Sequence, residues 1–139
     1  MFEVVHTLTD WYDGPRRGVA DFQGLPHVFE SESSDGNDLD VDTFLLMPID
    51  STTFSLTLED WKIWRRWETA FHQGTATRKT HPALPEDRER HEELERLLER
   101  RLQIDPANAI RQKAEFRLRN DPEWSGVGWK PLEVRWQDT

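Results

Sequence analysis

The sequence contains no cysteine. This absence excludes disulfide bonds, thiolate catalysis and zinc or iron–sulfur sites with cysteine ligands. The chain also has no apolar run long enough to span a membrane as a helix, and its seven glycines exclude a collagen-like repeat. Walker A, GxGxxG and GxSxG motifs are missing, so nothing in the sequence supports a nucleotide-binding or serine-hydrolase function. We therefore expect no cofactor.

Basic residues are scarce in the first part of the chain. The whole chain has a net charge of −9, and residues 1–60 contain 13 acidic residues against two basic ones, Arg16 and Arg17. Binding to nucleic acid depends on neutralising phosphates, so we expect no nucleic-acid partner. The N-terminus lacks a basic region followed by an apolar stretch, which predicts no signal peptide, a cytoplasmic location and no membrane association.

Aliphatic residues are also few, but aromatic residues compensate for them. Hydrophobic residues make up 35% of the 139 residues, and the chain contains seven Trp and seven Phe. Each buried aromatic side chain removes roughly 150–250 Å² from water. This length suits one domain, so we expect residues 1–139 to fold as a single domain with an acidic flexible loop at about 31–40.

The pattern of apolar residues predicts an α+β fold. Two helices are expected in the middle of the chain, the second running from Pro85 to about Gln103 with a narrow leucine stripe. Alternating β-branched and aromatic residues predict strands on both sides of them, at 2–12, 18–22, 25–32, 41–49, 113–119 and 131–137. We expect an antiparallel sheet of four to six strands, open or curled into a partial barrel, in which the first and last strands pair.

The first helix is expected to run from Asp50 or Ser51, either of which can cap it, to about His72, with Gly74 as its stop. The first turns stay ambiguous, because residues 53–58 also alternate as a strand does. An ordinary surface helix has a narrower apolar stripe. This helix should therefore be packed on two sides, or packed on one side while it presents tryptophan to a partner. Its broad stripe consists of Phe54, Leu58, Trp61, Trp64, Trp67 and Phe71.

Glu68 and His72 are the candidate catalytic residues. Four residues apart on a helix, they lie inside the aromatic stripe rather than on the polar face, where they could share a proton as a general acid/base pair. With His81, or with His91, they are also weak candidates for a metal site of two histidines and a carboxylate, although no specific metal-binding spacing supports one. The structural alternative is that Glu68 bonds an indole N–H or an arginine and that His72 sits at the helix end, where an imidazolium is mildly favoured.

Tryptophans outside a predicted core are the candidate binding residues. Trp124 and Trp129 lie in a turn-rich loop, and Trp64 lies on the central helix. Exposed tryptophan is typical of contact surfaces. Trp136, on the last predicted strand, is expected in the core.

Two functions remain open from the sequence. The first is a small soluble interaction module whose tryptophan-rich surfaces contact a protein partner or a second copy of the chain. The alternative is a small enzyme or ligand-binding protein with an acid/base or metal pocket around Glu68 and His72. The first predicts an exposed apolar patch without a deep pocket, and the second predicts a concave site where polar groups converge.

Overall fold

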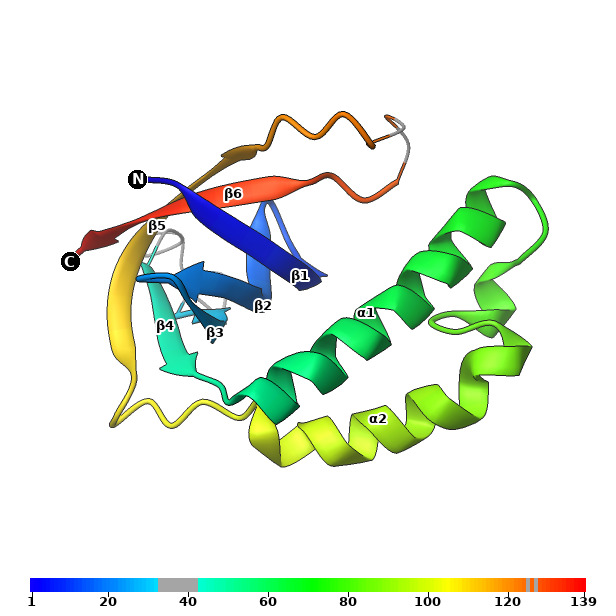
Figure 1. The fold of residues 1–139 in the computed structure, drawn as a ribbon, viewed down its shortest axis with the longest axis horizontal. Helices are drawn as coiled ribbons and strands as arrows, with labels where there is room; N and C mark the ends of the chain where they lie inside the picture. Colours follow the sequence, from blue (N-terminus) through cyan, green and yellow to red (C-terminus); the bar gives the residue numbers. More distant parts are fainter. Residues whose placement is uncertain (33–42, 125, 127) are drawn as a thin grey trace.

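Six antiparallel strands close into a barrel, and two helices are inserted between the fourth and fifth strands (Figure 1). The computed structural model describes residues 1–32, 43–124, 126 and 128–139. This architecture confirms the α+β prediction. Most of the expected acidic loop, residues 33–40, lies outside the described residues. The strands are β1 (Glu3–Trp11), β2 (Pro15–Phe22), β3 (Leu25–Ser31), β4 (Thr43–Pro48), β5 (Ile110–Leu118) and β6 (Leu132–Asp138).

The barrel closes through a short pairing between its first and last strands. Glu3 pairs with Val134 and Val4 with Glu133, which confirms the expected pairing of the two ends of the chain. Figure 1 shows the two termini on the same side of the barrel. Among the described residues, the rest of β1 pairs with β2 alone. The seam between β1 and β6 is therefore open beyond Val4.

Aromatic rings fill the barrel interior. Phe29, Phe44, Phe116 and Trp136 pack with ring centroids 5.6 to 6.2 Å apart, mostly edge to face. The indole nitrogen of Trp136 donates a 2.8 Å hydrogen bond to the Asp21 carbonyl. Trp136 therefore belongs to the core, as the sequence predicts, and the aromatic residues replace the missing aliphatic ones.

The ambiguous segment 53–58 is helical. Helix α1 (Ser51–His72) begins at Asp50, whose carboxylate accepts a 2.7 Å hydrogen bond from the Thr53 amide. The Thr57 hydroxyl donates to the Thr53 carbonyl at 2.8 Å, so this buried polar group is satisfied within the helix.

The end of α1 also follows the prediction. The helix ends at His72, one residue before its C-cap, and Gly74 follows with a φ of +79°. Glycine adopts this left-handed conformation without the steric cost that a side chain brings. The chain therefore turns at the predicted stop.

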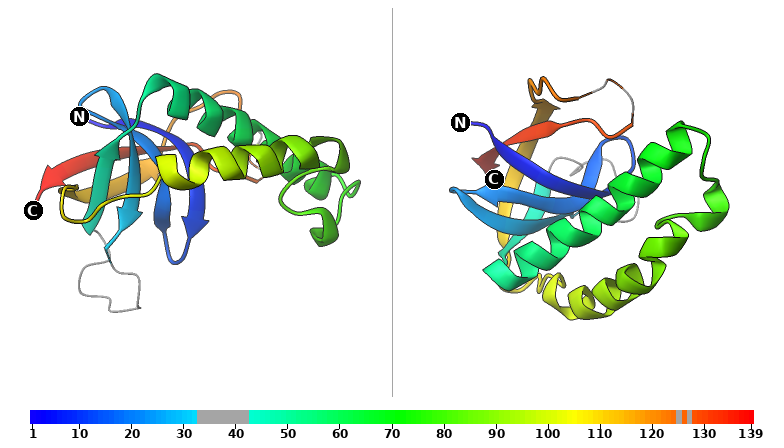
Figure 2. Two further views of the ribbon diagram at one scale, coloured as in Figure 1. Left: turned by 90° about the horizontal axis from the view of Figure 1, so that it is seen from below. Right: turned by 45° about the vertical axis from the view of Figure 1, so that its right-hand side comes forward.

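Helix α1 packs on two sides, as its broad apolar stripe predicts. It forms a hairpin with α2 (Arg88–Arg101), which follows short 3-10 turns at Arg78–Thr80 and Pro85–Asp87. Ile63 and Leu94 are fully buried between the two helices, and Phe54 packs edge to face on His6 of β1 at 4.8 Å. Figure 2 shows α1 crossing the barrel beside β1. No helix in the described part of the chain is long and apolar enough to cross a membrane.

Candidate ligand-binding cleft

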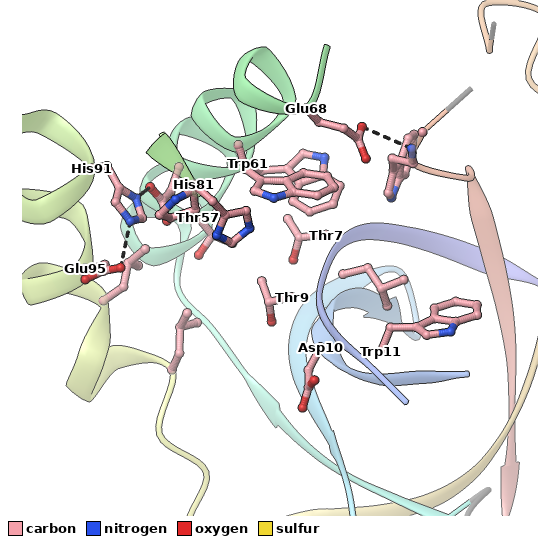
Figure 3. Close-up of a pocket in the computed structure, with 18 of the residues that line it drawn as sticks. Thr7, Thr9, Asp10, Trp11, Thr57, Trp61, Glu68, His81, His91 and Glu95 are labelled. Carbon is pink, nitrogen blue, oxygen red and sulfur yellow. Dashed lines mark hydrogen bonds and ion pairs between the residues drawn. The ribbon is translucent and has the colours of Figure 1, made fainter. Parts of the chain in front are cut away.

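A cavity of about 750 Å³ lies where the barrel seam opens under the helical hairpin. We call it the seam cleft. One wall is the end of β1, the opposite wall is the segment 128–130, and the helices form the roof (Figure 3). The cleft is lined by Thr7, Leu8, Thr9, Asp10, Trp11, Thr57, Asp60, Trp61, Trp64, Glu68, His81, Pro82, His91, Glu95, Leu98, Leu102, Gly128, Trp129 and Lys130.

Three indole rings form an aromatic wall in the seam cleft. Trp61 and Trp64 stack with centroids 4.9 Å apart and an interplanar angle of 24°. Trp129 meets Trp61 edge to face at 5.7 Å. All three side chains are half-buried, so they combine a fixed packing arrangement with surface that faces the cavity.

Glu68 ties this wall to the loop opposite. The residue as a whole is only 8% exposed. One carboxylate oxygen accepts a 3.1 Å hydrogen bond from the Trp129 amide and also bonds the Arg65 guanidinium. Figure 3 shows the Glu68 side chain directed from α1 across the cleft, with a dashed line for its hydrogen bond to the opposite wall. A hydrogen bond to a charged acceptor is stronger than a neutral one, so Glu68 fixes the position of the Trp129 backbone.

Gly128 makes the approach of Glu68 possible. A Cβ atom built on Gly128 would lie 2.8 Å from Glu68 Oε1 and 2.9 Å from its Cδ, closer than real Cβ atoms come. The φ of Gly128 is +78°, in the left-handed region. The backbone conformation therefore favours glycine here, and any side chain at this position would displace the Glu68 carboxylate from its present place.

On the other side of the seam cleft, a histidine lies between two carboxylates. His91 of α2 is buried, and its Nδ1 lies 2.7 Å from Asp60 Oδ1 on α1. Glu95 Oε1 lies 2.7 Å from its Nε2, an ion pair when the ring is protonated. Burial raises the pKa of the Asp60 carboxyl above its ordinary value, and the hydrogen bond with His91 opposes this rise. This group therefore joins α1 to α2 beside the cavity.

The predicted pair Glu68 and His72 lie on the same side of α1 but differ in environment. Both line a second, shallower hollow of about 510 Å³, together with His81. His72 is exposed and its ring contacts Phe71, whereas the hydrogen bonds of Glu68 go to Arg65 and Trp129. In the described part of the chain, no three His, Asp or Glu side chains are arranged to hold a metal ion.

The predicted binding residues separate into two groups. Trp64 and Trp129 meet in the seam cleft, although they are 65 residues apart. Trp124 is half-buried in the β5–β6 connection and is not among the residues that line the cleft. Sequence reasoning named His91 only as a possible metal ligand with Glu68 and His72, and it missed Asp60, the acid that His91 contacts. The two residues lie on different predicted helices, with no spacing that links one to the other.

Comparison of this chain with protein-family models, with curated proteins and with solved structures finds no match. The function proposed below rests on the seam cleft itself.

Proposed function

We propose that the protein binds a small organic ligand with a flat apolar body in the seam cleft. The observation that carries this proposal is the convergence of Trp61, Trp64 and Trp129 on one cavity of about 750 Å³. Small-molecule sites are clefts of roughly 300–1,000 Å³ with mainly apolar and aromatic walls and a few placed polar groups. Thr57, Glu68 and the group around His91 supply such polar atoms here.

The polar groups favour binding over catalysis. The carboxylates at the two ends of the cleft already have partners within the protein. Glu68 bonds Arg65 and the Trp129 amide. Asp60 bonds His91. A carboxylate engaged in this way still attracts and orients a charged ligand, whereas a general acid or base must exchange a proton with the substrate. The protein is therefore a binding protein in this proposal.

The test is a titration followed by the indole N–H signals in NMR spectra of the folded protein. The probes are 2-phenylethanol, phenethylamine and phenylacetate, which share a phenyl ring. We expect saturable shifts of the Trp61, Trp64 and Trp129 signals and none for Trp136 inside the barrel. The absence of saturable shifts at the three cleft indoles with every probe would refute the proposal.

A pair of matched variants separates the cleft from the rest of the surface. Trp61→Leu removes part of the aromatic wall and should weaken binding of the probe that binds best. Trp124→Leu removes an equally half-buried indole outside the cleft and should leave binding unchanged. Far-UV circular dichroism of both variants checks that they fold.

A second function, contact with a protein partner or a second copy, is favoured by the end of the β1–β2 hairpin. Trp11 and Tyr12 are 56% and 74% exposed at this point, and Trp11 borders the seam cleft. Analytical ultracentrifugation tests self-association. A concentration-dependent dimer that Tyr12→Ser abolishes, and that Leu25→Ser at another exposed site leaves intact, would support it. A monomer at all concentrations would exclude self-association.

A further inference from the structure

We propose that the ligand of the seam cleft is an organic cation, an amine or quaternary ammonium compound with an apolar body. This inference rests on the proposed function, since it concerns the ligand of the same site. It follows from three features of the cleft: the sign of the charges around it, the arrangement of its aromatic faces, and a cation that the chain itself places against them.

The charged groups of the seam cleft are mostly carboxylates. Lys130 is the only lysine or arginine among the lining residues, and it is exposed. His91 lies between two of the acids, and His81 lies at the edge of the cleft with its ring against Trp67. The acidic lining residues come from β1 and from both helices, and they are Asp10, Asp60, Glu68 and Glu95.

The aromatic wall suits a cation for a second reason. The face of an indole ring carries partial negative charge and attracts a cation that lies over it, most strongly where water is excluded. The stacked Trp61 and Trp64 and the perpendicular Trp129 present indole surfaces in more than one direction around one space. An ammonium group there meets ring faces and carboxylates together.

The chain already places one of its own cations against this wall. The Arg65 guanidinium carbon lies 5.2 Å from the centroid of Trp129, and the same guanidinium bonds Glu68. Arg65 approaches from the edge of the cleft and is not one of its lining residues. The Arg65 guanidinium thus contacts an indole face and a carboxylate at the same time. The other indole rings and acidic side chains of the cleft offer a bound cation the same pair of contacts.

An anionic or neutral ligand fits less well. An anion would face four carboxylates, of which Glu68 is already paired with Arg65. Its counter-charges would be that engaged guanidinium and one exposed lysine. A neutral ligand would gain from the rings but would leave the acids of the cleft without a new partner. Both cases are outcomes of the test.

The experiment compares the dissociation constants of three probes of similar size with the wild-type protein. These are phenethylamine, neutral 2-phenylethanol and anionic phenylacetate, measured through the cleft indole signals. We expect phenethylamine to bind roughly three- to thirtyfold more tightly than 2-phenylethanol, and phenylacetate to bind most weakly. Added salt should weaken the binding of phenethylamine and leave the binding of 2-phenylethanol unchanged.

Two variants of α2 locate the charge effect. Glu95→Gln removes one negative charge from the cleft, and Glu99→Gln removes one from an exposed position on the same helix outside it. We expect Glu95→Gln to weaken phenethylamine binding roughly two- to fivefold and to leave 2-phenylethanol binding unchanged. Glu99→Gln should leave both unchanged.

The outcomes distinguish the two proposals. Equal affinity for phenethylamine and 2-phenylethanol would overturn the cation proposal while the binding function stands. An equal loss of phenethylamine affinity in Glu95→Gln and Glu99→Gln would do the same. Tightest binding of phenylacetate would overturn it as well. If none of the probes shifts the cleft indoles, both proposals fail.

Discussion

Replacing Gly128 with alanine tests the contact between Glu68 and the loop that forms the opposite wall of the seam cleft. The new Cβ would lie 2.8 Å from Glu68 Oε1, so the buried carboxylate must move away. A left-handed conformation costs a residue with a side chain about 1–2 kcal/mol. Loss of the charged hydrogen bond from the Trp129 amide adds about 1.5–3 kcal/mol. Gly128→Ala should therefore lower the free energy of unfolding by about 2.5–5 kcal/mol.

Gly126 provides the matched control, because it lies in the same loop with a φ of +84° and no atom within 4 Å of a built Cβ. Gly126→Ala should incur the backbone cost alone, about 1–2 kcal/mol. Urea denaturation followed by circular dichroism measures both variants. In a Glu68→Ala background the cost of Gly128→Ala should fall to that of the control. Equal losses for the two glycine variants in the wild-type background would refute the proposed role of Glu68.

Three further predictions concern the framework around the cleft. Phe29→Ala should lower the free energy of unfolding by about 3–5 kcal/mol in urea denaturation, because Phe29 is fully buried among the barrel rings; a loss below about 1 kcal/mol would contradict that packing. Leu94→Ala should lower the free energy of unfolding by about 2–5 kcal/mol, since Leu94 is fully buried between the helices. It should also weaken probe binding. Unchanged probe binding would show that the cleft does not depend on the helical hairpin. The hydrogen bond from Arg90 lowers the pKa of Glu59 in the folded protein. The stability that Glu59 contributes is therefore fully present above the pKa of Glu59 in the unfolded chain, about 4.3. It is lost as the pH falls through the lower pKa of the folded protein. The free energies of unfolding of wild type and Glu59→Gln should differ by at most about 1 kcal/mol, because the ion pair is exposed. Urea titrations at several pH values should show this difference vanish over that pH range. A difference independent of pH would refute the assignment.

Much of the fold follows from local signals in the sequence. The strands were predictable because alternation persists through β5 and β6, and the stop of α1 was predictable because Gly74 follows its last turn. The start of α1 was predicted at Asp50 or Ser51 and is confirmed, but residues 53–58 stayed ambiguous because they also alternate as a strand would. The Asp50 cap and the burial of Thr53 and Thr57 against neighbouring elements decide in favour of the helix. Tertiary contacts override the local pattern there.

The site was only partly predictable, because it is assembled from distant segments. The helical angle of Glu68 correctly indicated a buried carboxylate, but its partner Trp129 lies 61 residues further along the chain. The contact between Asp60 and His91 depends on how α1 and α2 are rotated about their axes, which no periodicity within either helix fixes. His72 has the helical angle of a buried residue, yet it is exposed at the last turn of α1.

The distribution of the tryptophans explains why the cleft stays open. Trp136 packs against the rings of the barrel core and bonds the Asp21 carbonyl. Trp67 is buried, with its indole nitrogen bonded to the Thr80 hydroxyl at 3.0 Å. The cleft indoles, in contrast, keep apolar surface in contact with water, which forgoes roughly 25 cal/mol for each Å² left exposed. Collapse would recover that free energy, but it would have to move α1, which is held to α2 through Ile63 and to the opposite loop through Glu68. The framework therefore holds the aromatic wall in place without a ligand, so a ligand that filled the cleft as we propose would gain the burial without the cost of reorganising the protein.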